Sequence, residues 1–132
     1  MEILAALFID GIDIRQVAGP STRIDLSGIQ FSAPAPSEPP FTIEPHLVVI
    51  VHNPADGAPN AALEVVYTCE GEQIARNVQP LQVEPGKFNY RLVRAELELK
   101  AYSSVEAHCR LDLGAEIVVP YTVLPPVGPS AD

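Results

Sequence analysis

Residues 41–76 constrain the fold of this 132-residue chain more than any other stretch. They contain Leu47–Val51, an unbroken apolar run that is typical of a strand covered on both faces. Asn53–Gly57 has the composition of a turn. Ala62–Cys69 nearly alternates, and Glu70-Gly71 after it predicts a tight hairpin into a further strand. This stretch therefore predicts antiparallel β-structure with the apolar run near its centre.

Short segments of similar character recur along the chain. Residues 3–9 are apolar at every position, which indicates an interior strand, and Asp10-Gly11 predicts a hairpin after it. A turn is predicted at residues 17–21, and a shift in alternation around Gly28 predicts a β-bulge. The expected strands are residues 3–9, 12–14, 24–31, 41–52, 62–69, 72–76, 88–101, 105–113 and 117–123.

The second half of the chain leaves one alternative open. Apolar positions change phase near Val93, so residues 88–101 contain either a bulge or a strand that passes from one sheet to another. Residues 91–101 also carry a helical stripe of apolar residues, but four consecutive alternations favour a strand. Residues 77–86 are predicted as a loop with a β-like middle. Pro120 cannot donate a backbone hydrogen bond, which indicates that the closing strand lies at a sheet edge.

Many short strands at regular spacing, without a compelling helix, predict an all-β fold. We expect an antiparallel two-sheet β-sandwich of about 8–10 strands, formed by residues 1–124 as a single domain, with residues 125–132 as a flexible tail. Within the domain, the prolines of residues 32–40 preclude a strand ladder and favour an extended crossover between the sheets. Pro36–Pro39 also matches the PxxP pattern of ligands for proline-binding domains, but without basic neighbours a stiff crossover is the better interpretation.

The charge of the chain limits its partners. A net charge of −9 repels a phosphate backbone at long range, and no cluster of Lys and Arg offsets it locally. Nucleic acid and anionic membranes are therefore poor partners. The first residues lack the basic segment of a secretory signal, and no apolar run approaches the roughly 18 residues of a membrane span. We therefore expect a cytoplasmic protein.

The cysteines give little sign of chemistry. Cys69 and Cys109 both fall on the inward phase of their predicted strands. A disulfide between two sheets would need an oxidising compartment, so two small buried thiols are the better interpretation. His108 precedes Cys109, but strand alternation sends neighbouring side chains to opposite faces, so the two cannot form a catalytic dyad.

Metal ligands are sparse in this sequence, and we expect no metal site. His46 and His52 share a face of one predicted strand, but six residues of strand separate them by about 20 Å, too far for one metal ion. A zinc site would need His108 or a carboxylate from another strand. Calcium would need acidic end loops, and no Asp-x-Asp-x-Asp spacing occurs. The carboxylates that could gather at the ends of a sandwich are Asp10, Asp13, Asp25, Asp112 and Glu116.

Enzymes are disfavoured by the absence of catalytic motifs. The sequence has no Gly-rich phosphate loop, no G-x-S-x-G, no H-E-x-x-H and no C-x-x-C. We therefore expect a non-enzymatic protein with no catalytic residue and no cofactor.

Taken together, these segments resemble a family of small uncharacterised bacterial β-sandwich proteins, a domain of unknown function. The similar parts are residues 3–10, residues 24–31 with Gly28, Pro40-Phe41, residues 63–74, Tyr102, residues 105–111 and residues 114–123. The resemblance covers most of the chain, but its motifs are turn glycines and alternating apolar residues. It implies a compact sandwich of immunoglobulin-like or C2-like topology and implies no activity.

Three functions remain open on the sequence alone. The first is a protein-interaction or structural module that binds a protein partner or itself, because exposed sheet edges can accept another strand. The second is a small-molecule or calcium-binding sandwich that uses the acidic end loops at residues 10–25 and 112–116. The third is a secreted or virion structural domain with a disulfide between the two cysteines.

Overall fold

The computed structural model describes residues 1–16, 22–112 and 114–126, and these residues form strands, turns and bends without a helix. The prediction of an all-β fold is therefore confirmed. The predicted turn at residues 17–21, Leu113 and residues 127–132 of the predicted tail lie outside the described residues.

The strands of the described residues are more numerous than predicted. Three of them, β4, β5 and β10, have only three residues each and arise from segments that were assigned to the crossover or to longer strands. In chain order the strands are β1 (Glu2–Ile9), β2 (Gly11–Gln16), β3 (Thr22–Ser27), β4 (Ser32–Pro34), β5 (Phe41–Ile43), β6 (His46–His52), β7 (Asn60–Cys69), β8 (Glu72–Gln82), β9 (Phe88–Arg94), β10 (Leu97–Leu99), β11 (Ser104–Leu111) and β12 (Ile117–Leu124).

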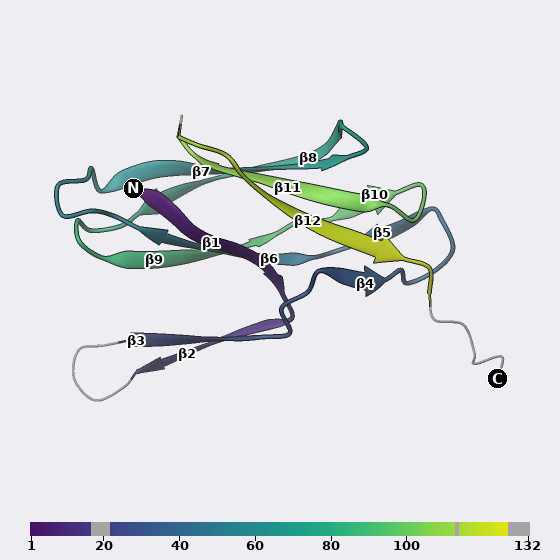
Figure 1. The fold of residues 1–132 in the computed structure, drawn as a ribbon, viewed down its shortest axis with the longest axis horizontal. Coiled ribbons are helices and arrows are strands. Elements are labelled where there is room, and N and C mark those ends of the chain that lie inside the picture. Colours follow the sequence, from purple (N-terminus) through teal and green to yellow (C-terminus); the bar gives the residue numbers. More distant parts are fainter. Residues whose placement is uncertain (17–21, 113, 127–132) are drawn as a thin grey trace.

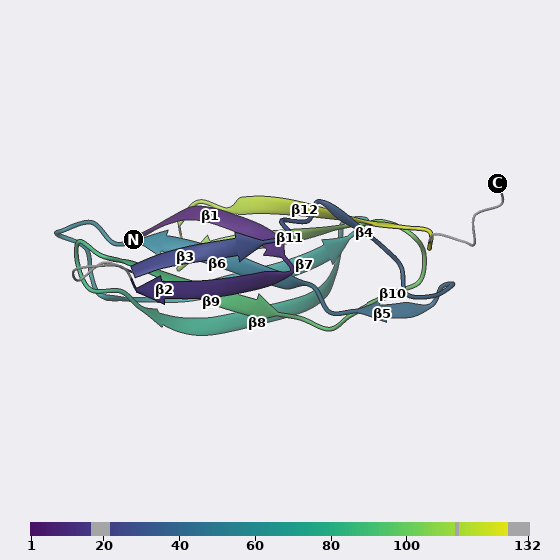
Figure 2. The same cartoon turned by 90° about the horizontal axis from the view of Figure 1, so that it is seen from below.

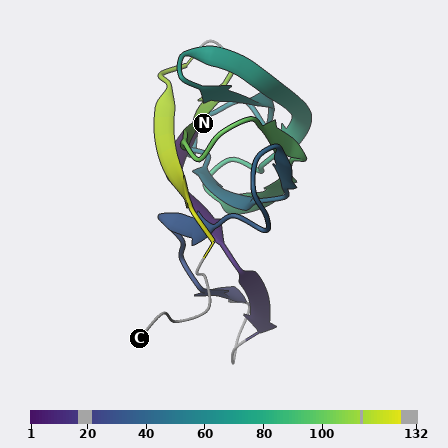
Figure 3. The same ribbon diagram turned by 90° about the vertical axis from the view of Figure 1, so that its right-hand side faces the viewer.

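Two main sheets face each other, as the end-on view in Figure 3 shows. One has three strands in the order β1-β6-β9, and the other has five in the order β4-β12-β11-β7-β8. Strand pairing is antiparallel except between β4 and β12, which are parallel. The short pair β5–β10 extends one end of the body, and the hairpin β2–β3 lies below the three-stranded sheet in Figure 1. This arrangement is compatible with the predicted β-sandwich.

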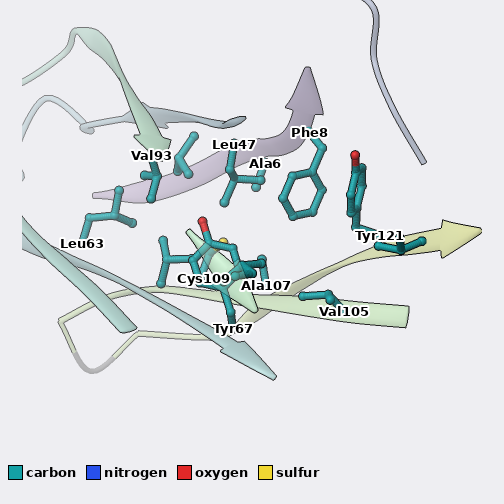
Figure 4. Packing of buried hydrophobic residues seen from close by; sticks show 14 of the residues in the cluster. Ala6, Phe8, Leu47, Leu63, Tyr67, Val93, Val105, Ala107, Cys109 and Tyr121 are labelled. Carbon is teal, nitrogen blue, oxygen red and sulfur yellow. The ribbon is translucent and has the colours of Figure 1, made fainter. Parts of the chain in front are cut away.

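The hydrophobic core fills the space between the two main sheets (Figure 4). Strand alternation supplies it, because every second side chain of β7 and β11 points inward. Phe8 and Tyr121 pack together across the sheets, with their ring centroids 4.8 Å apart. The largest side chains that are fully buried are those of Tyr67, Phe8, Leu47, Leu63, Leu81, Leu97 and Leu99.

Strand β6 confirms the prediction of an apolar central strand covered on both faces. It lies between β1 and β9, and Leu47, Val49 and Val51 belong to the core cluster. Val48 is equally buried but does not belong to that cluster, because it points to the outer face. The predicted strand 41–52 is nevertheless divided: its first residues form β5, which pairs with β10 instead of continuing the ladder of β6.

The hairpin after β7 was predicted correctly. Glu70 and Gly71 both have positive φ values, 53° and 80°, as a two-residue turn between twisted antiparallel strands requires. The predicted turn after β6 is also present, because the amide of Gly57 donates to the carbonyl of Pro54 at 2.9 Å. Buried Asn53 holds this turn against the β8–β9 connection by donating to Ala58 (3.0 Å) and Val83 (2.8 Å).

The prediction of an interior strand at residues 3–9 was wrong. β1 has a ladder partner on one side only, β6, and Leu4 stays half exposed. Asp10-Gly11 does not form a hairpin either, because β2 pairs with β3 and not with β1. The hairpin β2–β3 faces β6 and β9 (Figure 2), so part of β1, with Leu4, stays open to water.

Gly28 does not form the predicted β-bulge, because β3 ends just before it. Its φ is 62°, and the amide of Asp10 donates to the carbonyls of both Ser27 and Gly28 at 3.0 Å. A Cβ atom at position 28 would overlap the carboxylate of Asp10, so only glycine fits this turn. The predicted strand 24–31 therefore ends at Ser27.

Three predictions about proline were wrong. Residues 32–34 form β4 and pair with β12, although the prolines of the crossover had seemed to preclude a ladder. β8 continues through Pro80 into the predicted loop, because β8 is the outermost strand and the missing donor costs no ladder bond there. β12 is not an edge strand, because β4 pairs with it at Thr122–Leu124, beyond Pro120.

The phase change near Val93 has the second of its two predicted causes. β9 pairs with β6, whereas β10 pairs with β5 in a separate small sheet. The chain thus passes from one sheet to another between Arg94 and Leu97. Strand was the correct prediction for residues 91–94 and 97–99, whereas Lys100 and Ala101 form a bend.

Candidate functional site

The acidic candidates of the first half of the chain lie along the hairpin β2–β3 and at its base. Asp13 and Asp25 are directly opposite each other, and Asp25 accepts a hydrogen bond from Arg15 at 3.1 Å. Asp10, at the base, accepts a hydrogen bond from the side-chain amide of Gln30. The predicted acidic end loop at residues 10–25 is therefore a hairpin, as far as the structure describes it.

The two candidates of the second half are also engaged inside the protein. One oxygen of Asp112 accepts a hydrogen bond from the backbone amide of Ala62 at 2.9 Å. Glu116 lies 2.7 Å from Nδ1 of His108. In residues 1–16, 22–112 and 114–126, no three His, Cys, Asp or Glu side chains come together in a way that could hold a metal ion. Calcium binding therefore finds no support in the geometry of these carboxylates.

A carboxylate, an imidazole and a hydroxyl are aligned on the outer face of the five-stranded sheet. Glu116 contacts Nδ1 of His108, and Nε2 of the same ring lies 3.0 Å from Oγ1 of Thr68. This order of groups is the one that activates a hydroxyl nucleophile in hydrolases. Here the three groups lie on the face of a sheet, where their contacts hold β7, β11 and the β11–β12 connection together.

Glu64 forms a second polar cluster on the same face. It accepts hydrogen bonds from Arg76 on β8 and from Arg110 on β11, both at 2.9 Å. The hydrogen bond from Arg76 is the main cause that lowers the pKa of the Glu64 carboxyl group, and the bond from Arg110 adds to it. The cluster ties three neighbouring strands together and leaves no free carboxylate for chemistry.

Both cysteines are free thiols on adjacent strands of one sheet. Cys69 lies opposite Val105, four residues from Cys109 along β11, so about 13 Å of strand separates the two positions. A disulfide between them is therefore excluded by distance. Burial raises the pKa of the Cys109 thiol to about 12, which makes it a poor nucleophile, and His108 does point to the opposite face as predicted.

Polar groups converge at the end of β6 that carries His46. Two hollows of about 280 Å³ each flank this residue, and Glu44 lines both. In one of them the hydroxyl of Tyr121 donates to Gln30 at 3.0 Å, and Gln30 in turn donates to Asp10. Both hollows are shallow. The structure places His52 at the far end of β6, where it lies 3.3 Å from Glu2, so the two histidines are separate as predicted.

An apolar cleft of about 290 Å³ lies between the hairpin β2–β3 and the outer face of the three-stranded sheet. Figure 2 shows the hairpin on this side of the molecule, with β1 and β9 to either side of it. Ile14 and Ile24 of the hairpin form one wall, and Ile50, Phe88 and Tyr90 of β6 and β9 form the other. Phe88 is 64% exposed and Ile14 is 47% exposed, so the hairpin covers this part of the sheet only in part.

Sequence reasoning did not find this cleft. Alternation in β2, β3 and β9 predicted which residues share a face of each strand. It could not predict that the hairpin folds back over the outer face, because β1 and β2 were expected to pair with each other. Ile14 was visible in the sequence as an apolar residue of a short strand and gave no sign of its exposure.

Comparison with known proteins provides no family for this chain: no family model, no curated protein and no solved structure matches it. Among the described residues there is no helix that could cross a membrane. Any function must therefore be argued from the geometry of the chain itself.

Proposed function

We propose that this chain is a non-enzymatic protein-interaction module that binds a partner through the cleft between β2–β3 and the β6–β9 face. The sandwich is then of the immunoglobulin-like or C2-like kind, related to the small bacterial β-sandwich proteins that its sequence resembles, and works in the cytoplasm. The charge of −9 makes protein a better partner than nucleic acid or an anionic membrane.

The observation that carries this proposal is the contrast between the packed core and the half-exposed cleft. Phe88 and Ile14 leave apolar surface open to water on two facing walls. Binding a partner side chain there removes that surface from water, which favours association by about 25 cal/mol for each Å² buried. Apolar walls around a small cleft are also the feature that distinguishes interaction sites from scattered surface residues.

Selection from a phage-displayed library of random linear peptides tests this proposal. We expect the protein to enrich peptides whose binding is lost in Phe88→Ser and in Ile14→Ser. Phe31→Ser is the matched control, because Phe31 is also a largely exposed phenylalanine, at 74%, and does not line the cleft. If no selected peptide depends on Phe88, the cleft is not a binding site and the proposal fails.

Sedimentation equilibrium over a concentration series distinguishes a foreign partner from a second copy. A monomer at all concentrations supports a foreign partner. A dimer that Phe88→Ser dissociates and Phe31→Ser retains would make the partner a second copy of the chain.

A further inference from the structure

The outer edge of β2 is open to a further strand. Apart from β3, no described strand runs alongside β2, and no backbone hydrogen bond joins residues 11–16 to another described element. β2 also contains no proline, so all of its residues can donate to a ladder.

The outermost strands of the two main sheets are less accessible. β4 contains Pro34 and β8 contains Pro80, and β1 is bridged to the segment after β3. β9 is bordered by β8, where Asn89 donates to the carbonyl of Gln82 at 3.1 Å. An extended segment that adds to a sheet of this protein therefore finds its best edge at the hairpin β2–β3.

The hairpin β2–β3 is too narrow to cover the outer face of the three-stranded sheet. β2 is the strand of the hairpin on the side of β9, and β3 is the strand on the side of β1 (Figure 2). Phe88 of β9 remains 64% exposed, and Ile14 of β2, in the opposite wall of the cleft, is 47% exposed. A third strand beside β2 extends this layer toward β9, where apolar side chains on its inner face would remove Phe88 from water.

The outer face of the hairpin defines the charge of such a strand. Ile14 and Ile24 line the cleft, so alternation places Asp13 and Asp25 on the outer face, directly opposite each other. Like charges in this arrangement destabilise a strand pair. Arg15 neutralises Asp25, whereas Asp13 forms no ion pair in residues 1–16, 22–112 and 114–126. A basic side chain beside Asp13 offsets the repulsion, and the net charge of −9 attracts a basic segment at long range.

We propose that the free edge of β2 binds an extended peptide segment that has one apolar face and a lysine or arginine at the centre of its other face. The peptide adds as the third strand of the hairpin's sheet. Its apolar side chains enter the cleft against Phe88, and its basic side chain pairs with Asp13. This inference rests on the proposed function, since both use the same cleft, and it adds the conformation and the charge of the partner segment.

A second copy of the chain fits this edge less well. Two identical antiparallel strands are related by a two-fold axis normal to their sheet, so both sandwiches would lie on the same side of the joined hairpins. The sandwich lies on one side of the hairpin (Figure 3), and β9 occupies that side next to β2 (Figure 2). The first sandwich therefore takes part of the space that the second would need.

Fluorescence anisotropy with synthetic peptides tests the inference. The probe is a labelled peptide of 6 residues, the length of β2, in which valine alternates with threonine and with one central lysine. We expect it to bind about tenfold more tightly than the same peptide with glutamate for lysine, because an attractive pair with Asp13 replaces a repulsive one.

Two variants separate the contact with Asp13 from the net charge of the protein. Asp13→Asn should remove most of the difference between the two peptides, and it also removes the repulsion from Asp25, so it does not weaken the hairpin. Asp56→Asn is the matched control, because it removes the same charge from an exposed turn residue and should retain the difference. An equal effect of the two variants would overturn the pairing with Asp13.

N-methylated versions of the lysine peptide provide the structural readout. A strand added at an edge uses alternate backbone amides for the ladder and leaves the others in water. N-methyl groups on one alternate set should therefore abolish binding, whereas those on the other set should retain it. Equal effects of both sets, equal affinity for the lysine and glutamate peptides, or no binding of either would overturn the inference.

These failures are distinguishable from failure of the proposed function. If peptides from the random library still depend on Phe88, the cleft binds a partner that does not add to β2, and the proposed function stands. Self-association of the protein that the lysine peptide dissociates would assign the edge of β2 to a second copy and overturn the inference.

Discussion

The two faces of β6 differ in what covers them, although their sequence is equally apolar. On the inner face, Val49 packs against a second sheet in a fully buried core. On the outer face, Val48 is just as buried, but two residues further along the strand Ile50 lines an open cleft. The inner face meets a whole sheet, whereas the outer face meets a two-stranded hairpin. A strand pattern thus predicts burial, but the size of the covering layer decides how complete the burial is.

The largest loss of stability is expected at Asn53, the buried polar residue after β6. Asn53→Ala removes the donors to the buried carbonyl of Val83 and to the carbonyl of Ala58 in the turn, which should lower the free energy of unfolding by about 3 kcal/mol. Urea denaturation measures the change. Asn60→Ala is the control, because Asn60 is exposed at the start of β7 and should tolerate the change within about 0.5 kcal/mol.

The next prediction compares the two faces of β6 directly. Val49→Ala should cost about 2 kcal/mol, because two packed sheets cannot close around the cavity. Val48→Ala should cost only about 1 kcal/mol, because the outer face of β6 is packed less tightly than the inner face, as the open cleft at Ile50 shows. Both residues are 0% exposed, so exposure does not confound the pair. Equal losses in urea denaturation would show that the hairpin packs as rigidly as the second sheet.

A smaller effect of opposite sign is expected from Tyr67 in the core. Its hydroxyl is buried and has no hydrogen-bond partner among the described residues, and burial raises its pKa well above the usual range. Tyr67→Phe removes this unpaired group and should stabilise the protein by about 1 kcal/mol. Tyr121→Phe should instead destabilise it by about 1 kcal/mol, because that hydroxyl donates to Gln30. A loss of stability in Tyr67→Phe would contradict the prediction.

The smallest effect concerns acid stability on the outer face of the five-stranded sheet. Arg76 and Arg110 lower the pKa of Glu64 in the folded state below its unfolded value of 4.5. The folded state is therefore favoured while the carboxylate is ionised, above about pH 4.5, and loses this advantage as the pH falls through the lowered pKa. Glu64→Gln should flatten the acid side of the melting-temperature profile, measured from pH 7 to pH 3. Glu72→Gln, an exposed carboxylate on β8 that forms no ion pair in residues 22–112, should leave the profile unchanged.

Local signals predicted the parts of the fold that depend on neighbouring residues. Glu70-Gly71 specified its turn because glycine and a tight two-residue loop favour positive φ values. β11 was recognised because its alternation is strict, and β6 because its apolar run is unbroken. Cys109 and His108 were assigned to opposite faces for the same reason. Each of these features depends on an interval of a few residues.

Partners distant in sequence could not be predicted in this way. Thr68 and His108 come within 3.0 Å only because β7 and β11 are adjacent in one register, and many other registers fit the same alternation. Asp112 and Glu116 were candidates for one shared site, but each binds a group on a different strand. Asp112 accepts from a backbone amide of β7, and Glu116 contacts a histidine of β11. The cleft could not be predicted without knowing that the chain after Asp10 forms a separate hairpin that faces β6 and β9.

By itself, the sequence determined an all-β chain with an apolar central strand, a tight hairpin after β7 and a change of alternation near Val93. The tertiary structure alone decided that the chain changes sheets near Val93 and that the hairpin β2–β3 leaves a cleft against β6 and β9. The physical reason is that side-chain periodicity fixes which residues share a face, whereas the element that covers the face depends on contacts between distant parts of the chain.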